Sequence, residues 1–329
     1  MPDTPGHDQI RGHESLSAAM MAGKTGGKTI VMKFGGTSVG DLERIRAVAK
    51  RVKVEHDRGR RVAVVVSAMA GVTNRMVGYC RDLDPLADPR EYDAVVAAGE
   101  QVTSGLVAIA LQALGVKARS WQGWQIPLVT DDAHGKAAIE GIDGSTLLAC
   151  LDEGVIPVIA GFQGVGPDGR IATLGRGGSD TSAVAIAASI NADQCDIYTD
   201  VDGIYTTDPR IVKRARRLDR ITYEEMLELA SVGAKVLQTR SVGLAMRENV
   251  RVRGLSSVSV SIDESGTTVV DEAELVEQEL VAGSANPHDE AKISVCVLPD
   301  RTRSAAVRCG PPDVPRTNAA SLVHSTGAE

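Results

Sequence analysis

Apolar runs alternate with segments of helical periodicity over most of the chain. Residues 29–33 form a short apolar run, and residues 61–66 form an almost uninterrupted β-branched run, which is typical of a strand buried on both faces. Asp41 can cap a helix between these two strands, because the apolar residues that follow it recur at helical spacing. These residues are Leu42, Ile45, Val48 and Val52. The order strand, glycine loop, helix, strand predicts a βαβ unit, and such units favour a parallel sheet.

The same two patterns continue to about residue 257. Further helices are predicted over residues 92–114, 145–153, 179–190 and 231–248, and further strands over residues 155–160, 195–199 and 250–253. The turn sequence at residues 166–169 predicts a β-hairpin. Thr222 and Glu225 have the spacing of a capping box at another helix start. We therefore predict the fold class α/β, with one domain over residues 29–257 and a mainly parallel sheet sandwiched by helices.

The segments on either side of this domain differ from it in composition. Residues 1–28 are polar and predict a flexible N-terminal arm. Residues 258–281 are rich in acidic side chains and predict a linker. Residues 282–329 contain one clear strand pattern, at residues 291–298, followed by prolines and small polar residues. We expect that last segment to be incomplete as a fold and partly disordered.

Composition and charge exclude several classes of protein. The chain has 329 residues, with 36 Lys and Arg against 43 Asp and Glu, and its net charge of −7 does not fit a general binder of nucleic acid or of anionic membranes. It has no apolar run of about 18 residues, so no transmembrane helix is expected. The polar start of the chain predicts no secretory signal. The five cysteines are scattered without a CxxC pair, which argues against a disulfide framework or a structural zinc site. The cytoplasm is the expected compartment.

The first candidate for chemistry is the glycine loop at the end of the first predicted strand, Lys33-Phe34-Gly35-Gly36-Thr37-Ser38. Adjacent glycines let backbone N–H groups approach an anion closely, and the following helix N-terminus and the lysine add positive charge. A purely structural turn with a solvated lysine is the alternative. The Gly-Lys-Thr strings at residues 23–25 and 27–29 lack the first glycine of a P-loop, so they predict no phosphate site.

A second glycine loop opens the Ala-rich helix and holds three polar side chains on one turn, namely those of Arg176, Ser179 and Asp180. Arginine is suited to bidentate recognition of a carboxylate or a phosphate. The alternative is a capped helix start with a solvated arginine.

A third loop, residues 198–210, carries Asp200, Asp202 and Asp208 and suggests a site for a cation or a polar ligand. It lacks the pattern of an EF-hand. Shorter motifs at residues 67–74, 98–100 and 233–237 are, taken singly, more typical of structural elements.

Together these strings resemble the aspartate kinases of the amino acid kinase superfamily over about residues 29–257. The sibling kinases that act on acetylglutamate, glutamate, carbamate or UMP share the Lys-x-Gly-Gly start, but they usually lack the combination of Phe-Gly-Gly-Thr-Ser with Gly-Arg-Gly-Gly-Ser-Asp. The resemblance implies the amino acid kinase fold. It also implies transfer of the ATP γ-phosphoryl group to the side-chain carboxylate of L-aspartate, giving 4-phospho-L-aspartate and ADP, the first step toward lysine, threonine, methionine and diaminopimelate.

The resemblance also implies roles for individual residues. The catalytic residues would be Lys33, Asp180 and Lys235. The residues that bind the substrate aspartate would be Ser67, Thr73, Glu100, Arg176 and Ser179, with Arg176 on a carboxylate and Glu100 on the ammonium group. The nucleotide would be bound by Lys33, Phe34, Gly35, Gly36, Thr199, Asp200, Tyr205, Asp208, Arg210 and Lys235. Mg²⁺, carried with ATP and bridging its oxygens, is also implied, with few direct protein ligands. The expected partners are ATP and L-aspartate, with no nucleic acid and no membrane, and a homo-oligomer stays open.

The C-terminal region departs from this family. Aspartate kinases normally continue into two regulatory ACT modules, and residues 289–295 resemble the first strand of such a module, but the following residues match nothing in it. We therefore expect a kinase core whose activity stays flat when lysine and threonine are titrated together; clear inhibition at millimolar levels would refute this. Two alternatives remain. One is an inactive or weakly active remnant with a binding or regulatory role, and the other is a sibling amino acid kinase.

Overall fold

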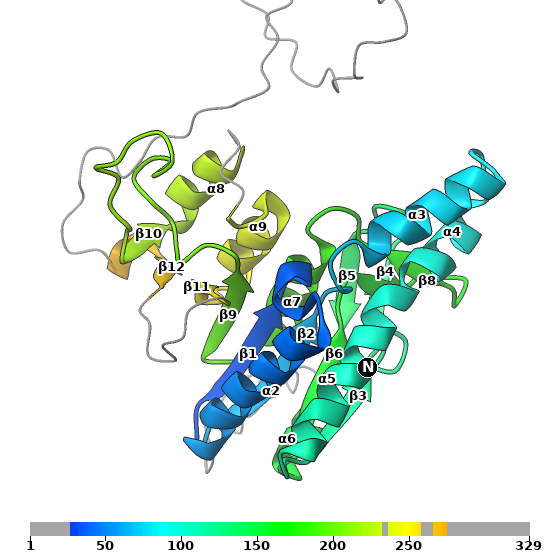
Figure 1. Ribbon diagram of the computed structural model, residues 1–329, viewed down its shortest axis with the longest axis horizontal. Coiled ribbons are helices and arrows are strands. Elements are labelled where there is room, and N and C mark those ends of the chain that lie inside the picture. Colours follow the sequence, from blue (N-terminus) through cyan, green and yellow to red (C-terminus); the bar gives the residue numbers. More distant parts are fainter. Residues whose placement is uncertain (1–26, 232–235, 258–265, 275–329) are drawn as a thin grey trace, which may run out of the picture. The chain divides into compact units, whose positions relative to one another are not determined.

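The computed structural model describes residues 27–231, 236–257 and 266–274 (Figure 1). An eight-stranded sheet forms the centre of this part of the chain. In spatial order its strands are β10 (Arg220–Thr222), β12 (Thr267–Val270), β11 (Val252–Ser256), β9 (Gln194–Thr199), β1 (Thr29–Phe34), β2 (Arg61–Val66), β6 (Ile156–Ala160) and β3 (Ala118–Trp121). Neighbouring strands run parallel except β11 and β12. The predicted α/β class with a mainly parallel sheet is confirmed.

Alternate residues of the central strands face two different helical layers. Met32 on β1 and Val64 on β2 belong to one apolar cluster with α2 (Leu42–Asp57) and α5 (Ala98–Ala113), which lie side by side (Figure 1). Val31 and Val65 belong to a second cluster, which contains the helices α6 (Ser145–Asp152), α7 (Gly178–Ser189), α8 (Tyr223–Ser231) and α9 (Thr239–Arg247). This arrangement explains the continuous β-branched run at residues 61–66, because both faces of β2 are buried.

Local sequence signals define several element ends as predicted. The Asp41 side chain accepts a hydrogen bond from the Arg44 amide and caps α2. Thr222 and Glu225 form the reciprocal capping box of α8, each amide bonding the other side chain at 3.1 Å. The predicted hairpin is also present.

That hairpin belongs to a second, four-stranded sheet in the order β5 (Ile139–Ile142), β4 (Leu128–Thr130), β7 (Gln163–Val165) and β8 (Ile171–Thr173).

The helix predicted over residues 92–114 is wrong in its bounds, because the structure has two helices there. Asp88 caps α4 (Pro89–Val96), which ends at Ala97 just before α5 begins. The Gln163 side-chain amide donates a hydrogen bond to the Ala97 carbonyl at 3.2 Å, at the point where the two helices meet. A side chain from β7 therefore binds the carbonyl at the junction of the two helices.

Two further predictions need correction. Ser231 ends α8 instead of starting a helix, residues 236–238 are not helical, and α9 begins at Thr239. Strand β12 (Thr267–Val270) lies within the segment expected to be a linker, so the main sheet continues past residue 257. The arm before residue 27 and the strand predicted at residues 291–298 lie outside the described residues. Helix α3 (Val72–Leu83) and the 3₁₀ helices η1 (Gly36–Val39) and η2 (Glu272–Glu274) complete the described elements.

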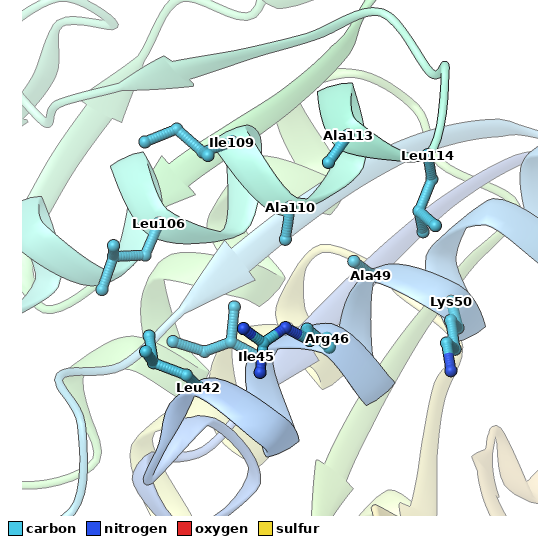
Figure 2. Close-up of a pocket in the computed structure, with 10 residues that line it drawn as sticks. All are labelled: Leu42, Ile45, Arg46, Ala49, Lys50, Leu106, Ile109, Ala110, Ala113 and Leu114. Carbon is cyan, nitrogen blue, oxygen red and sulfur yellow. The ribbon is translucent and has the colours of Figure 1, made fainter.

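The outer surface of the α2–α5 layer contains a mostly apolar groove of about 350 Å³. Figure 2 shows its lining, in which Leu42 and Ile45 of α2 face Leu106 and Ala110 of α5. Among the described residues, only the stretch Pro89–Ala113 is long and apolar enough to span a membrane by length and composition. Half of its most apolar 18-residue window is buried inside the fold, where apolar residues pack against the sheet and α2.

Candidate active site

The candidate residues gather at the carboxyl ends of four neighbouring parallel strands. Strand β1 is paired with β2 on one side and with β9 on the other, and β6 follows β2. From β1 the chain continues to β2 and β6 on one side of β1, and it later forms β9 on the other side. The strand order therefore reverses its direction at β1. Ligands of open α/β sheets bind in the crevice outside the strand ends at such a switch in strand order.

Lys33 and Asp180 form a buried ion pair at this edge. Lys33 is the penultimate residue of β1 and Asp180 lies in the first turn of α7, and the Nζ and Oδ1 atoms are 2.5 Å apart. Their side chains are only 8% and 11% exposed. The carboxylate therefore fixes the position of an ammonium group that water largely cannot reach, and screening by solvent is weak there.

Gly36 lies where the glycine loop passes the loop after β2. A Cβ atom added at Gly36 would stand 2.8 Å from the Ala68 carbonyl oxygen, closer than real side chains approach, whereas one at Gly35 would meet Lys33 Nζ at 3.6 Å. The Phe34 side chain is fully buried and stacks on Tyr198 with ring centroids 4.6 Å apart. Its carbonyl accepts a hydrogen bond from the Ser67 amide. Phe34 thus connects the end of β1 to the loop after β2.

A cavity of about 540 Å³ opens in front of this loop and brings together many of the predicted site residues. Its lining includes Lys33, Gly36, Ser67, Thr73, Glu100, Arg176, Ser179 and Asp180. These residues come from four segments that are far apart in the sequence. All five residues predicted to bind the substrate aspartate therefore line one cavity, together with the Lys33–Asp180 pair.

Glu100 supplies the second buried charge of the cavity. It lies in the first turn of α5 and is only 3% exposed; its Oε1 accepts a hydrogen bond from the Ala68 amide at 2.9 Å. Its Oε2 is buried without a hydrogen-bond partner among the described residues. Burial raises the pKa of Glu100 to about 7, against the opposing effect of the Ala68 hydrogen bond and the positive charge of Lys33. A cationic ligand group would supply the missing partner.

The turn that carries Arg176 joins β8 to α7. Gly175 and Gly177 on either side of Arg176 have φ values of 73° and 72°, which other residues rarely adopt. Arg176 is exposed at the cavity edge, and the amide groups of the first turn of α7 lie beside it. An arginine next to a helix N-terminus creates a positive environment suited to an anionic ligand.

The predicted nucleotide loop follows β9, next to β1 in the sheet, but its residues do not line the cavity. Thr199 ends β9, and Asp200 comes directly after it. The Tyr205 hydroxyl donates to Asp202 at 2.9 Å. The Arg210 guanidinium pairs with both oxygens of Asp208. Lys235 lies outside the described residues.

Comparison with known proteins agrees with this geometry. The model of the amino acid kinase family matches residues 28–253. An aspartokinase of Pseudomonas aeruginosa is 51% identical over 284 residues, covering 86% of this chain and 68% of the relative. The chain belongs to the aspartate kinases of the amino acid kinase family. The family predicted from the glycine loops is thereby confirmed.

Solved structures support the same assignment. Aspartate kinase from Synechocystis is 46% identical with a TM-score of 0.65, and the match covers 74% of this chain and 40% of that one. Escherichia coli aspartokinase III in complex with aspartate and ADP is 31% identical with a TM-score of 0.64, over 75% of this chain and 65% of that one. This aspartate kinase chain thus spans about two thirds of its Pseudomonas relatives and less than half of the Synechocystis protein.

Several cavity residues of this aspartate kinase were absent from the predicted site. Asn74, Tyr92, Gly135 and Phe162 line the cavity as well. Phe162 has a φ of 69°, a backbone conformation unusual for a residue with a side chain. Gly135 lies in a loop, residues 131–138, that contains no motif, so only the tertiary structure places it at the site. Asn74 and Tyr92 stood inside or beside predicted motifs without a chemical signal of their own.

Proposed function

We propose that this cavity transfers the γ-phosphoryl group of ATP to the side-chain carboxylate of L-aspartate, giving 4-phospho-L-aspartate and ADP. The observation that supports this best is the buried Lys33–Asp180 pair beside Glu100 and Arg176 in one cavity. The product would feed the biosynthesis of amino acids of the lysine, threonine and methionine group, and we propose a cytoplasmic location for the reaction.

The acceptor needs no general base. A free aspartate side chain has a pKa near 4, so its carboxylate is already ionised at neutral pH. One carboxylate oxygen forms the new bond to the γ-phosphorus, while the bond from that phosphorus to the bridging oxygen breaks and the electron pair leaves with ADP. The protein has to neutralise charge and hold two anions in line. The Lys33 ammonium and the backbone amide of Gly36 can perform that task.

Two charged side chains that line the cavity, the exposed Arg176 and the buried Glu100, match the charged groups of an amino acid substrate. We propose that Arg176 binds a carboxylate and that Glu100, whose Oε2 has no protein partner in the described structure, binds the ammonium group. Ser67, Thr73 and Ser179 add hydroxyl groups around the same space. This arrangement favours a zwitterionic substrate over an acetylated amine, because acetylation removes the positive charge that Glu100 requires.

We further propose that the nucleotide extends from the Lys33 loop toward the loop after β9, which contains Thr199, Asp200, Tyr205, Asp208 and Arg210, and that Lys235 contributes. No cluster of three or more metal-ligating side chains occurs among the described residues. The residues proposed for the nucleotide fit a magnesium ion that is held by the ATP phosphates and water, with few direct protein ligands. Bound in this way, the ion would reduce the negative charge of the phosphates.

The test is a hydroxamate assay with ATP, Mg²⁺, aspartate and hydroxylamine, because an acyl phosphate reacts with hydroxylamine to give aspartyl hydroxamate. We expect the wild-type chain to form this product, and we expect Lys33→Ala and Asp180→Ala to lower the rate by about 10²–10³-fold. Lys53→Ala is the matched control, since Lys53 forms only an ion pair with Asp57 on α2, and its rate should stay unchanged.

The same assay separates the alternatives. No hydroxamate from the folded wild-type chain would favour an inactive remnant with a binding role. Faster turnover of glutamate or acetylglutamate than of aspartate would identify a sibling amino acid kinase.

A further inference from the structure

Three segments of the chain meet behind one wall of the cavity at the side chain of Asp93. Asp93 lies on α4 and is completely buried. Its Oδ2 accepts hydrogen bonds from the amides of Gly135 at 3.0 Å and Thr173 at 2.9 Å, and it contacts His134 Nδ1 at 2.8 Å. Its Oδ1 accepts the Thr173 hydroxyl at 2.5 Å. One carboxylate therefore joins α4, the loop over residues 131–138 and the end of β8.

Two of the three residues bound by the Asp93 side chain form part of the cavity surface, while His134 and Asp93 itself do not. Gly135 and Thr173 line the cavity. A Cβ atom at Gly175 would stand 3.0 Å from the Gly135 carbonyl oxygen, so the 131–138 loop also packs directly against the turn that presents Arg176. A shift of this loop would consequently move the Arg176 turn.

Arg240, on a different helix, binds the same two segments. It lies in the first turn of α9, and its guanidinium donates hydrogen bonds to the carbonyls of Leu174 and, at 2.9 Å, Ala137. Leu174 is next to Thr173, and Ala137 is two residues after Gly135. Asp93 thus holds amide groups of these two segments, and Arg240 holds their carbonyl groups.

We propose that Asp93 and Arg240 are positioning residues that hold the 131–138 loop and the Arg176 turn together as one rigid wall, and that they thereby set the affinity for the acceptor amino acid. The inference deepens the proposed function and rests on it. A misplacement of about 1 Å by a residue that never touches the ligand can cost about 10²-fold in rate or affinity. Both anchors act on the aspartate side of the cavity, since none of their contacts is to the loop after β9.

The chemistry of the two anchors suggests suitable variants. Asp93→Asn keeps the volume but removes the negative charge that strengthens the bonds from the Gly135 and Thr173 amides, and its N–H₂ group forces the Thr173 hydroxyl to accept instead of donate. Arg240→Lys keeps the charge but replaces a planar fork with a single ammonium group, so one of the two carbonyls loses its partner.

The experiment measures KM for aspartate, KM for ATP and kcat, with calorimetric titration of aspartate as a readout that needs no turnover. We expect Asp93→Asn to raise KM and Kd for aspartate by about 10–100-fold, with KM for ATP within about twofold of wild type. Arg240→Lys should raise the aspartate constants by a smaller factor. Arg240→Lys also keeps the test decisive should Asp93→Asn fail to fold.

Two matched controls change the same two helices without touching the wall. Asp88→Ala deletes the cap of the same helix α4, and Arg247→Gln deletes an exposed ion pair with Glu248 on the same helix α9. Both should leave the aspartate constants unchanged. The proposal is overturned if Asp88→Ala raises them as much as Asp93→Asn, if KM for ATP rises in parallel, or if neither anchor variant changes them. A wild-type chain that binds aspartate without turnover would overturn the proposed function only, and the calorimetric comparison would still decide the role of the anchors.

Discussion

At the scale of single residues, the cavity keeps Lys33 and Glu100 in very different electrostatic situations. Lys33 has its counter-ion in Asp180, whereas Glu100 has one oxygen on the Ala68 amide and the other without a partner in the described structure. Burial therefore favours the neutral form of Glu100 and raises its pKa to about 7. A ligand ammonium group would reverse this preference, because it stabilises the carboxylate. Substrate binding and ionisation of Glu100 are thus coupled.

The coupling predicts a pH dependence for aspartate binding. Below about pH 7 the free cavity holds a neutral Glu100, so binding of the ammonium group has to release a proton, and KM for aspartate should rise by up to about tenfold for each further unit of pH decrease. The stability of the ligand-free protein changes with pH in the opposite direction. Because Glu100 binds its proton more tightly in the folded state than in the unfolded state, its contribution to the free energy of unfolding falls as pH rises from about 4.5 to about 7.

The measurement is KM for aspartate between about pH 6 and pH 8.5, followed by ADP release. Glu100→Gln should bind aspartate weakly at every pH and show no step near pH 7. A wild-type profile without a step, or an identical step in Glu100→Gln, would mean that another group titrates.

At the scale of elements, the glycine loop depends on a close approach between two pieces of backbone. η1 begins at Gly36, against the carbonyl of Ala68 in the loop after β2, and the same Ala68 donates its amide to Glu100. The glycine loop, for which we propose contact with the phosphates, and Glu100, for which we propose contact with the substrate, therefore meet at one residue. A methyl group at Gly36 would push these two segments apart.

Gly36→Ala should accordingly lower kcat by at least about 10²-fold, because the Lys33 loop and the Ala68–Glu100 contact move together. Gly40→Ala is the control, since a Cβ at Gly40 would make only ordinary contacts of 3.6 Å within the same 3₁₀ region. It should retain activity and thermal stability. Equal activity of the two alanine variants would show that the close approach is not needed.

Elements were predictable from the sequence where their determinants are local. The caps at Asp41 and Thr222 and the hairpin at residues 166–169 have partners within a few residues, and each appears as predicted. The break at Ala97 was not predictable, because it involves Gln163, which is 66 positions away. The short strands β3, β4 and β5 have partly exposed positions and only three or four residues each, which gives no usable periodicity.

The residues of the site divide in the same way, into those with a local sequence signal and those without one. Motifs at strand and helix ends identified Lys33, Arg176 and Asp180, because glycine turns and charged residues mark such positions in the sequence. Their roles in the reaction stay predictions. Asp93 was invisible inside a helical pattern, since its four hydrogen-bond partners come from residues 134–173. No local feature distinguishes it from a surface aspartate.

At the scale of the whole molecule, β12 (Thr267–Val270) connects the loop after β9, which we propose binds the nucleotide, to the main sheet. Thr267 is fully buried, and its hydroxyl accepts from the Ile204 amide at 2.8 Å and donates to the Leu218 carbonyl at 2.6 Å. Ile204 directly precedes Tyr205 in the middle of the loop over residues 198–210, so a strand some 60 residues later holds the centre of that loop. This long-range tie predicts a nucleotide-specific effect.

Thr267→Val keeps the shape of the side chain but leaves the Ile204 amide and the Leu218 carbonyl buried without that partner, which should cost about 1–3 kcal/mol of unfolding free energy. Because the loosened segment belongs to the loop after β9, KM for ATP should rise several-fold more than KM for aspartate. Thr267→Ser restores the hydroxyl and should recover most of both losses. Urea unfolding and the two KM values measure these effects. An equal rise of both KM values in Thr267→Val would show that β12 stabilises the domain as a whole and does not act on the nucleotide loop in particular.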